Sequence, residues 1–144
     1  MERKGQCLCG AVRFAVGALG NFGVCHCRQC QRWAGSALFG VNVPEAAMRV
    51  EGAEHIGSFR SSDWATRSFC TRCGSGLWYR YDKGVDGTGD YEVPVGLLDD
   101  ANGLELQSEI FADAKPDCWA LEGAHERLTS AETLAKFGPQ VEGT

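Results

Sequence analysis

Cys25-His26-Cys27-Arg28-Gln29-Cys30 places three thiols within six residues, and this stretch restricts the fold more than any other. Two further cysteine pairs flank it, Cys7-Leu8-Cys9 before it and Cys70-Thr71-Arg72-Cys73 after it. Such spacings bring sulfurs close enough to share one ion, and soft thiolates select zinc or iron–sulfur clusters over hard cations. The three segments therefore predict metal binding that ties the start of the chain to its middle.

The seven clustered cysteines divide most simply into a group of four and a group of three. A structural zinc has four protein ligands, whereas a catalytic zinc keeps three protein ligands and one open position. The continuous stretch supplies the smaller group, and the two flanking pairs then supply the larger one. We therefore predict a closed site at Cys7, Cys9, Cys70 and Cys73, and an open site at Cys25, Cys27 and Cys30.

Two alternatives stay open at this point. Cys27 and Cys30 could join Cys70 and Cys73 in a zinc ribbon, although the 39 residues from 31 to 69 exceed the ~15–20 usual for that motif. The smaller group could also be a second structural site, closed by His26 or by another side chain. The eighth cysteine, Cys118, stands alone and is expected to be a small buried or half-buried residue.

Size and charge exclude several classes of protein. The 144 residues suit one domain spanning 1–144, with 44% hydrophobic and 23% charged residues. The net charge is −5 and there is no basic run, so a nucleic-acid partner is not expected. No stretch approaches the ~20 apolar residues of a membrane span. Met1-Glu2-Arg3-Lys4 leads into no apolar signal region, so we expect a cytoplasmic protein, where clustered cysteines bind metal more often than they form disulfides.

Periodicity predicts a mainly β fold. Glycine accounts for 19 of the 144 residues, which we interpret as turns between short strands. Expected strands are 11–16, 37–43, 55–60, 66–69, 76–81, 91–97 and 104–111, with Pro94 moving its strand toward a sheet edge. One or two helical turns are expected at 28–35, and 84–90 is expected to be a loop. A capping box at Thr129-Ser130-Ala131-Glu132 starts a short C-terminal helix, which Gly138-Pro139 ends.

The cysteine motifs, read with their neighbours, resemble those of one known family. They are Gly5-Gln6-Cys7-Leu8-Cys9-Gly10-Ala11-Val12-Arg13-Phe14, then Cys25-His26-Cys27-Arg28-Gln29-Cys30-Gln31-Arg32-Trp33-Ala34-Gly35-Ser36, then Phe69-Cys70-Thr71-Arg72-Cys73-Gly74-Ser75-Gly76-Leu77-Trp78. A weaker one is Lys115-Pro116-Asp117-Cys118-Trp119. Together they resemble the glutathione-dependent formaldehyde-activating enzyme family, which includes centromere protein V type proteins. The resemblance extends from residue 5 to about residue 119.

That resemblance implies a β-tent type fold of small antiparallel sheets around two Zn²⁺ sites. It implies structural zinc at Cys7, Cys9, Cys70 and Cys73, and a second, less saturated zinc at Cys25, Cys27 and Cys30. It also implies carbon–sulfur lyase chemistry, in which the bond of S-hydroxymethylglutathione is made from glutathione and formaldehyde or broken. The expected partner is thus a small-molecule thiol. The alternative is a non-catalytic thiol carrier or a zinc-stabilised binding module.

The remaining site residues follow from the needs of a glutathione-like ligand. Its two carboxylates call for cationic donors, for which Arg28, Arg32 and Lys115 are candidates, and Trp119 is grouped with them as a substrate contact. No general base is evident. His26, between two ligands, is expected to point away from their metal, and His55 and His125 are expected at the surface. Ser108-Glu109 stands where family members often carry histidine.

Overall fold

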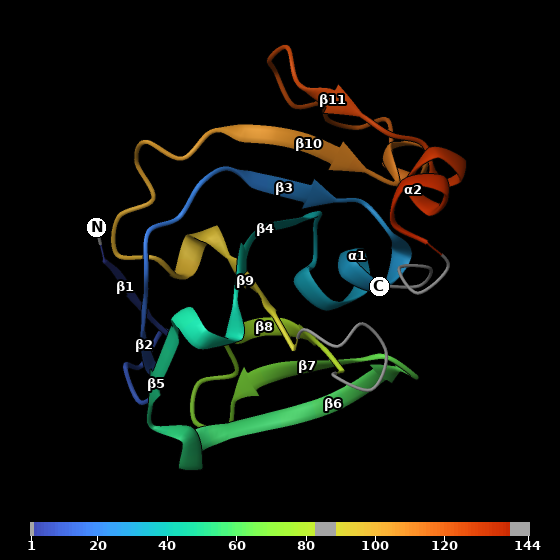
Figure 1. The fold of residues 1–144 in the computed structure, drawn as a ribbon. Helices are drawn as coiled ribbons and strands as arrows, with labels where there is room; N and C mark the ends of the chain where they lie inside the picture. Colours follow the sequence, from blue (N-terminus) through green and yellow to red (C-terminus); the bar gives the residue numbers. More distant parts are fainter. Residues whose placement is uncertain (1, 83–88, 139–144) are drawn as a thin grey trace.

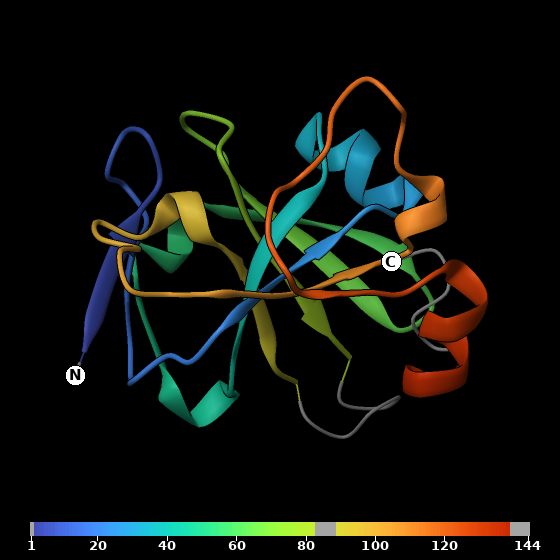
Figure 2. The same cartoon turned by 90° about the horizontal axis from the view of Figure 1, so that it is seen from above.

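A computed structural model describes residues 2–82 and 89–138 of the protein. Two β-sheets make up most of it, a small one formed mainly by the N-terminal segment and a large one that curves across the molecule (Figure 1). Both helices lie at the end of the molecule away from the small sheet (Figure 2). The predicted loop at 84–90 falls largely outside the described residues.

The small sheet is antiparallel and has the order β1-β2-β5. Its strands are β1 (Arg3–Gln6), β2 (Arg13–Val16) and β5 (Met48–Glu51). Phe14 and Val16 alternate with more exposed residues along β2 and are buried against the core. The period-2 pattern therefore places one face of this sheet on the interior.

The large sheet has eight strands in the order β11-β10-β3-β4-β9-β8-β7-β6. In chain order they are β3 (Phe22–Cys25), β4 (Leu38–Val43), β6 (Ile56–Ser62), β7 (Ala65–Cys70), β8 (Gly76–Tyr81), β9 (Tyr91–Pro94), β10 (Leu106–Ile110) and β11 (Glu126–Arg127). Strand β10 runs parallel to both β3 and β11, and the other pairs are antiparallel. Parallel pairing brings the C-terminal part of the chain beside the triple-cysteine segment.

The helices begin and end at residues that the sequence marks. Helix α1 (Arg28–Ala34) starts after Cys27, whose sulfur accepts a hydrogen bond from the Cys30 N–H, and ends at Gly35 with a φ of 78°. Helix α2 (Ser130–Phe137) has the predicted capping box between Thr129 and Glu132. Four 3₁₀ turns connect strands: η1 (Glu45–Ala47), η2 (Ala53–His55), η3 (Val95–Leu97) and η4 (Ala112–Ala114).

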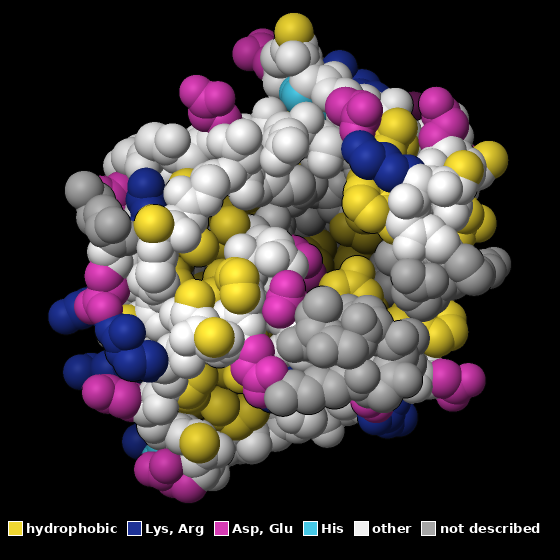
Figure 3. All heavy atoms as spheres, viewed as in Figure 1, with side chains coloured by type: hydrophobic (Ala, Val, Ile, Leu, Met, Phe, Trp, Pro, Cys, Tyr) yellow, Lys and Arg dark blue, Asp and Glu magenta, His cyan; other side chains and the backbone are white. Residues whose placement is uncertain are grey.

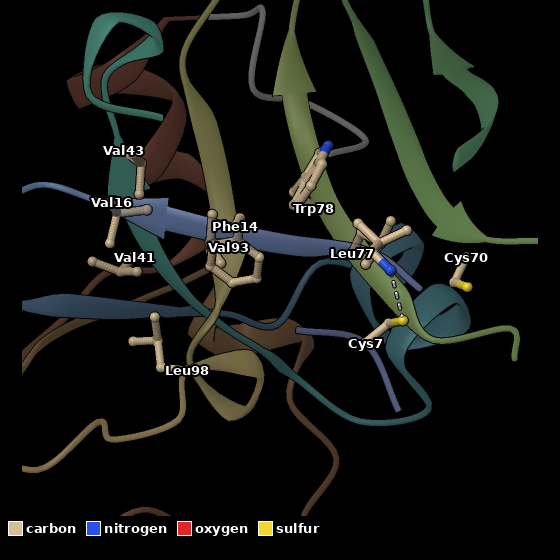
Figure 4. Packing of buried hydrophobic residues seen from close by; sticks show 11 residues of the cluster. Cys7, Phe14, Val16, Val41, Val43, Cys70, Leu77, Trp78, Val93 and Leu98 are labelled. Atoms are coloured by element: carbon tan, nitrogen blue, oxygen red, sulfur yellow. Dashed lines mark hydrogen bonds between the residues drawn. The ribbon is translucent and has the colours of Figure 1, made fainter. Parts of the chain in front are cut away.

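The main core lies between the small sheet and the central strands β4, β9 and β8 of the large one (Figure 4). Its buried members are Cys7, Val12, Phe14, Val16, Val41, Val43, Cys70, Leu77, Trp78, Val93 and Leu98. The Trp78 ring stands edge-on to the Phe14 ring at 5.7 Å between centroids. Because Cys7 and Cys70 belong to this core, the first cysteine group is continuous with the packed interior.

The prediction of a mainly β fold with a short C-terminal helix is confirmed. All seven predicted strands are present within a few residues, but β1, β3, β5 and β11 had not been predicted. The edge position expected from Pro94 is wrong, because β9 lies between β4 and β8 and tolerates proline as its last residue. No helix among the described residues is long and apolar enough to cross a membrane.

Candidate metal centres and the adjoining cleft

The first cysteine group, Cys7, Cys9, Cys70 and Cys73, joins the turn after β1 to the turn between β7 and β8. All four sulfurs lie within 4.8 Å of one another. The Sγ atoms of Cys7 and Cys9 are 3.7 Å apart, and those of Cys9 and Cys70 are 3.8 Å apart. Tetrahedral zinc with 2.3 Å bonds to sulfur requires ligand separations of about 3.8 Å. The spacing of these donors therefore fits a four-coordinate zinc.

Local hydrogen bonds orient the sulfur atoms of this first group and affect their pKa values. Val12 N donates to Cys7 Sγ at 3.4 Å (dashed in Figure 4). The Ser75 hydroxyl lies 3.3 Å from Cys73 Sγ, and its hydrogen bond is the main cause that lowers the pKa of Cys73 to about 5. Gly10 and Gly74 follow their cysteines with φ of 78° and 79°, a backbone conformation that side chains disfavour. These contacts thus favour thiolates at Cys7 and Cys73, whose pKa values are both lowered.

The second cysteine group, Cys25, Cys27 and Cys30, lies at the junction of β3 and α1. Its three sulfurs also lie within 4.8 Å of one another. Hydrogen bonds to its two partners raise the pKa of Cys25 well above its ordinary value, because the three thiols cannot all ionise so close together. A divalent cation would remove that conflict, so this donor set fits a soft metal with three protein ligands.

A buried arginine accompanies the second group. Arg67, on β7, is 2% exposed, and its two terminal nitrogens lie 3.7 and 3.8 Å from Cys30 Sγ. The guanidinium carbon lies 5.0 Å from the ring centroids of both Trp33 and Tyr79. No local pattern in the sequence predicts this contact, because Arg67 and Cys30 are 37 residues apart.

A cleft of about 290 Å³ opens beside the second group, over one face of the large sheet. Figure 3 shows a hollow in the face seen in Figure 1, with hydrophobic side chains around it. Most of its walls are apolar or aromatic, and the lining includes Gly23, Cys25, Cys30, Gly40, Tyr79 and Glu92. Among the described residues that line it there is no lysine or arginine.

Glu92 is the acidic side chain of this cleft. Its Oε1 accepts a hydrogen bond from Asn42 Nδ2 at 3.0 Å, across the β4–β9 pair. Burial raises the pKa of Glu92 to about 7, and the nearby charge of Asp90 adds to that effect. A carboxyl that titrates near neutrality beside a thiol cluster was not found from the sequence, since nothing local in Tyr91-Glu92-Val93 distinguishes it.

On the opposite face of β3 and β10, Glu109 links two histidines. His26 Nε2 lies 2.7 Å from Glu109 Oε1, and His125 Nε2 and Arg127 Nε lie 2.5 and 3.0 Å from Oε2. Burial opposes ionisation of Glu109, but these hydrogen bonds and the charge of Arg127 outweigh it and lower its pKa. His26 is fully buried and points away from the three sulfurs, as expected. The surface position expected for His125 is wrong, because its side chain is 4% exposed.

The four residues predicted to contact substrate lie outside the described lining of the cleft. Arg28 and Arg32 are exposed on α1. Trp119 packs against the His26 ring at 5.2 Å between centroids, and Lys115 Nζ lies 5.1 Å from the centroid of the Trp119 ring. Their role in binding stays a prediction.

The structure differs from two other expectations about the cysteines. The structure puts Cys27 and Cys30 with Cys25 and not with Cys70 and Cys73, so the zinc-ribbon grouping does not occur. Cys118 is exposed rather than buried or half-buried, because it lies in a turn beyond β10 with no core above it.

Comparison with known proteins agrees with these two cysteine groups. The family model described as glutathione-dependent formaldehyde-activating enzyme matches residues 2–114, which include both groups. The chain belongs to this family. The resemblance predicted from the cysteine motifs is therefore confirmed, and the family name is that of an enzyme, as predicted.

Individual relatives within the glutathione-dependent formaldehyde-activating enzyme family extend the match. An uncharacterised lyase of Schizosaccharomyces pombe is 27% identical over 134 residues, covering 92% of this chain and 95% of the relative. A provisionally named glutathione-dependent formaldehyde-activating enzyme of Halomonas elongata is 38% identical over 87 residues, covering 54% of this chain and 55% of its own. A crystal structure of a Rhodobacter sphaeroides protein shares the fold with a TM-score of 0.57 and 28% identity, covering 69% of this chain and 91% of that one.

Proposed function

We propose that this protein is a zinc-dependent carbon–sulfur lyase that makes or breaks the bond between a thiol and an aldehyde carbon, with S-hydroxymethylglutathione as the substrate class. One observation carries the proposal: Cys25 and Cys30, two of a group of three sulfurs, line the wall of a cleft. The family name and the name of the S. pombe relative support the same chemistry.

The two cysteine groups take different roles in this proposal. Cys7, Cys9, Cys70 and Cys73 would hold a structural zinc whose four positions are all filled by protein. Cys25, Cys27 and Cys30 would hold a second zinc, which would supply an open position for a substrate thiol and lower the pKa of that thiol. A reducing cytosol would keep these thiols available for metal.

The chain's own residues would prepare the second site for a small adduct. The Arg67 guanidinium beside Cys30 Sγ offsets negative charge on the cysteines. The apolar cleft walls would exclude water from the reacting carbon and sulfur. Because no described lysine or arginine lines the cleft, the carboxylates of a glutathione-like thiol would lie outside it, where Arg28, Arg32 and Lys115 remain the candidates to bind them.

The test is the rate of adduct exchange on the zinc-loaded full chain. Exchange NMR would follow the carbon of formaldehyde between its free form and its glutathione adduct, with and without protein. Wild type should accelerate the exchange. Cys27→Ser should abolish the acceleration while leaving a folded protein with one zinc, since it removes one of only three ligands.

The matched control is Cys118→Ser, because Cys118 is exposed and belongs to neither group. This variant should accelerate exchange as wild type does. Wild-type protein that binds glutathione without accelerating exchange would make the protein a thiol carrier and overturn the proposal. Equal rates in Cys27→Ser and wild type would also overturn it.

A further inference from the structure

Glu92 and Cys25 face the same cleft from two different strands. Glu92 lies on β9, opposite Asn42 of β4, and Cys25 lies at the end of β3, opposite Leu38 of β4. Residues on one face of a strand alternate, so Leu38, Gly40 and Asn42 share the face that bears the cleft. The carboxyl and the sulfur therefore both project over the same side of β4.

The separation between these two groups suits a small adduct. Glu92 Oε2 lies 3.6 Å from the position that a Cβ at Gly40 would occupy. Gly40 is two residues along β4 from Leu38, the partner of Cys25, which corresponds to about 7 Å along the strand. The carboxyl thus reaches back over β4 toward the cysteine group, and the remaining gap is about 7 Å along β4 plus the ~4.8 Å spacing between β4 and β3.

Two facing glycines leave the space between the two groups bare. Gly23 of β3 pairs directly with Gly40 of β4, and both line the cleft. A Cβ at Gly40 would meet only ordinary contacts, the nearest being Glu92 Oε2 itself. The glycine pair therefore leaves part of the floor between carboxyl and sulfur bare, and the Leu38 side chain, whose Cγ lies 3.8 Å from the Gly40 Cβ position, borders it on the cysteine side.

We propose that Glu92 is the residue that carries the proton to and from the oxygen of the thiol–aldehyde adduct, an inference that rests on the lyase function proposed above. In cleavage, the adduct hydroxyl gives its proton to the Glu92 carboxylate. The electron pair of that O–H bond forms the carbonyl π bond, and the carbon–sulfur bond breaks with its electrons on sulfur. In formation, sulfur attacks the carbonyl carbon, and the oxygen takes the proton from the Glu92 carboxyl.

The surroundings of Glu92 suit both directions of this transfer. A proton carrier works best when its pKa is near the working pH, and the pKa of Glu92 is about 7. The titratable or charged groups that face it or its cleft are Asp90 of its own segment, Tyr79 and Tyr81 of β8, Cys25, Cys30, and Arg67 behind Tyr79. Burial keeps the pKa of Tyr79 above its ordinary value, so this phenol stays neutral while Glu92 titrates.

The deciding variant is Glu92→Gln, which keeps the shape and the capacity to pair with Asn42 but cannot carry the proton. In the zinc-loaded exchange assay, the acceleration by this variant should be about 100-fold smaller than that by wild type. The pH profile of its rate should also lack the step near neutral pH that Glu92 causes in wild type. The matched control is Glu51→Gln, an exposed carboxylate on β5 outside the cleft, which should behave as wild type. Glu92→Gln with the wild-type rate and pH profile would overturn this inference alone.

A second measurement does not depend on turnover. In carbon-13 spectra of glutamate-labelled protein, the carboxyl resonance that is missing from Glu92→Gln should titrate near neutral pH and should move when thiol and formaldehyde are added. A resonance that stays fixed on addition would overturn the inference even if the variant were slow. Wild type that fails to accelerate exchange would instead overturn the proposed function, and this inference with it.

Gly40→Ala tests the position of the adduct. The added methyl would lie on the cleft floor, 3.6 Å from Glu92 Oε2, and should raise KM about 10-fold or more without unfolding the protein. Gly17→Ala is the control, because its methyl would make an ordinary 3.7 Å contact with Ala47 away from the cleft. Unchanged KM in Gly40→Ala would contradict an adduct lying between Glu92 and Cys25.

Discussion

Arg67 directs both terminal nitrogens of its guanidinium at Cys30 Sγ, at 3.7 and 3.8 Å, from a position that is 2% exposed. The contact joins β7 to α1, and the same guanidinium lies over the rings of Trp33 and Tyr79. A buried cation in this place compensates for negative charge on the second cysteine group. It also stiffens the wall of the cleft that Tyr79 provides.

Arg67→Met should therefore weaken metal binding at the second cysteine group by about 10- to 100-fold, the usual effect of losing a partner of a metal ligand. Competition with a chelator of known zinc affinity would measure it. Because methionine is apolar and can fill the space between the two rings, the free energy of unfolding of the variant should change much less than its zinc affinity. Arg32→Met, an exposed arginine on α1, is the control. Equal zinc affinity in Arg67→Met and wild type would contradict this role.

Glu109→Gln should destabilise the protein by about 3–5 kcal/mol, because a buried carboxylate between His26, His125 and Arg127 loses its charge. Urea unfolding would measure the difference. The control is Glu126→Gln, which removes a half-exposed ion pair with Lys136 and should cost about 1 kcal/mol or less. Similar losses in the free energy of unfolding for the two variants would show that the Glu109 cluster stabilises the protein no more than a surface ion pair does.

The effect of Glu109 should also depend on pH in one direction. Its pKa is lowered from an ordinary 4.5, so the folded state releases the proton more readily than the unfolded state. The stability that it contributes is complete above about pH 4.5 and is lost as the pH falls through the lower folded value. The gap in stability between wild type and Glu109→Gln should therefore narrow in acid. A gap that widens below pH 4.5 would contradict the lowered pKa.

The sequence predicted the parts of this site that depend on neighbours along the chain. Cys25, Cys27 and Cys30 lie within six residues, so the chain brings their sulfurs together locally. The α2 capping box is likewise a four-residue pattern with a fixed geometry. The strand predicted at 76–81 matches β8 to its exact bounds, although its three consecutive buried residues Leu77, Trp78 and Tyr79 do not alternate.

The unpredicted parts depend on how strands pair. Glu92 reaches the cleft because it lies opposite Asn42 in the β4–β9 register, and no pattern within β9 encodes that register. The contact of Arg67 with Cys30 and that of Glu109 with His26 likewise join segments far apart in the sequence. Strand β3 was missed because its four residues, one of them glycine, are too short to show alternation. Its parallel pairing with β10 then places Glu109 beside His26.

A chelator should remove metal from the second cysteine group before it removes metal from the first. The second group offers three sulfurs and the first offers four, of which Cys7 and Cys70 also belong to the buried core. Increasing chelator should first release one zinc with near-UV circular dichroism unchanged, and the second release should coincide with loss of that signal. Cys70→Ser should show no cooperative unfolding transition, whereas Cys118→Ser should unfold as wild type does. Release of both metals without loss of tertiary signal would contradict a structural role for the first group.

Glu92 should make the protein less stable as the pH rises from about 4.5 to about 7. Burial raises its folded pKa to about 7 from an ordinary 4.5, so the folded state holds the proton more tightly than the unfolded state does. Its unfavourable effect is absent below about pH 4.5, grows between pH 4.5 and 7, and reaches at most about 3 kcal/mol above that. The pH range in which Glu92 changes the stability lies above the range in which Glu109 does. One series of unfolding measurements across pH can therefore distinguish the effects of the two carboxyls.

Glu92→Gln should remove this decline, because its amide stays neutral at every pH. Urea unfolding from pH 4.5 to 8 should therefore give a stability difference, variant minus wild type, that rises with pH and levels off above about 7. Glu51→Gln, exposed on the small sheet, should give a difference that is flat across the same range. A flat difference for Glu92→Gln would mean that Glu92 ionises in the folded protein as easily as in the unfolded chain, and a difference that falls with pH would reverse the sign of its shift.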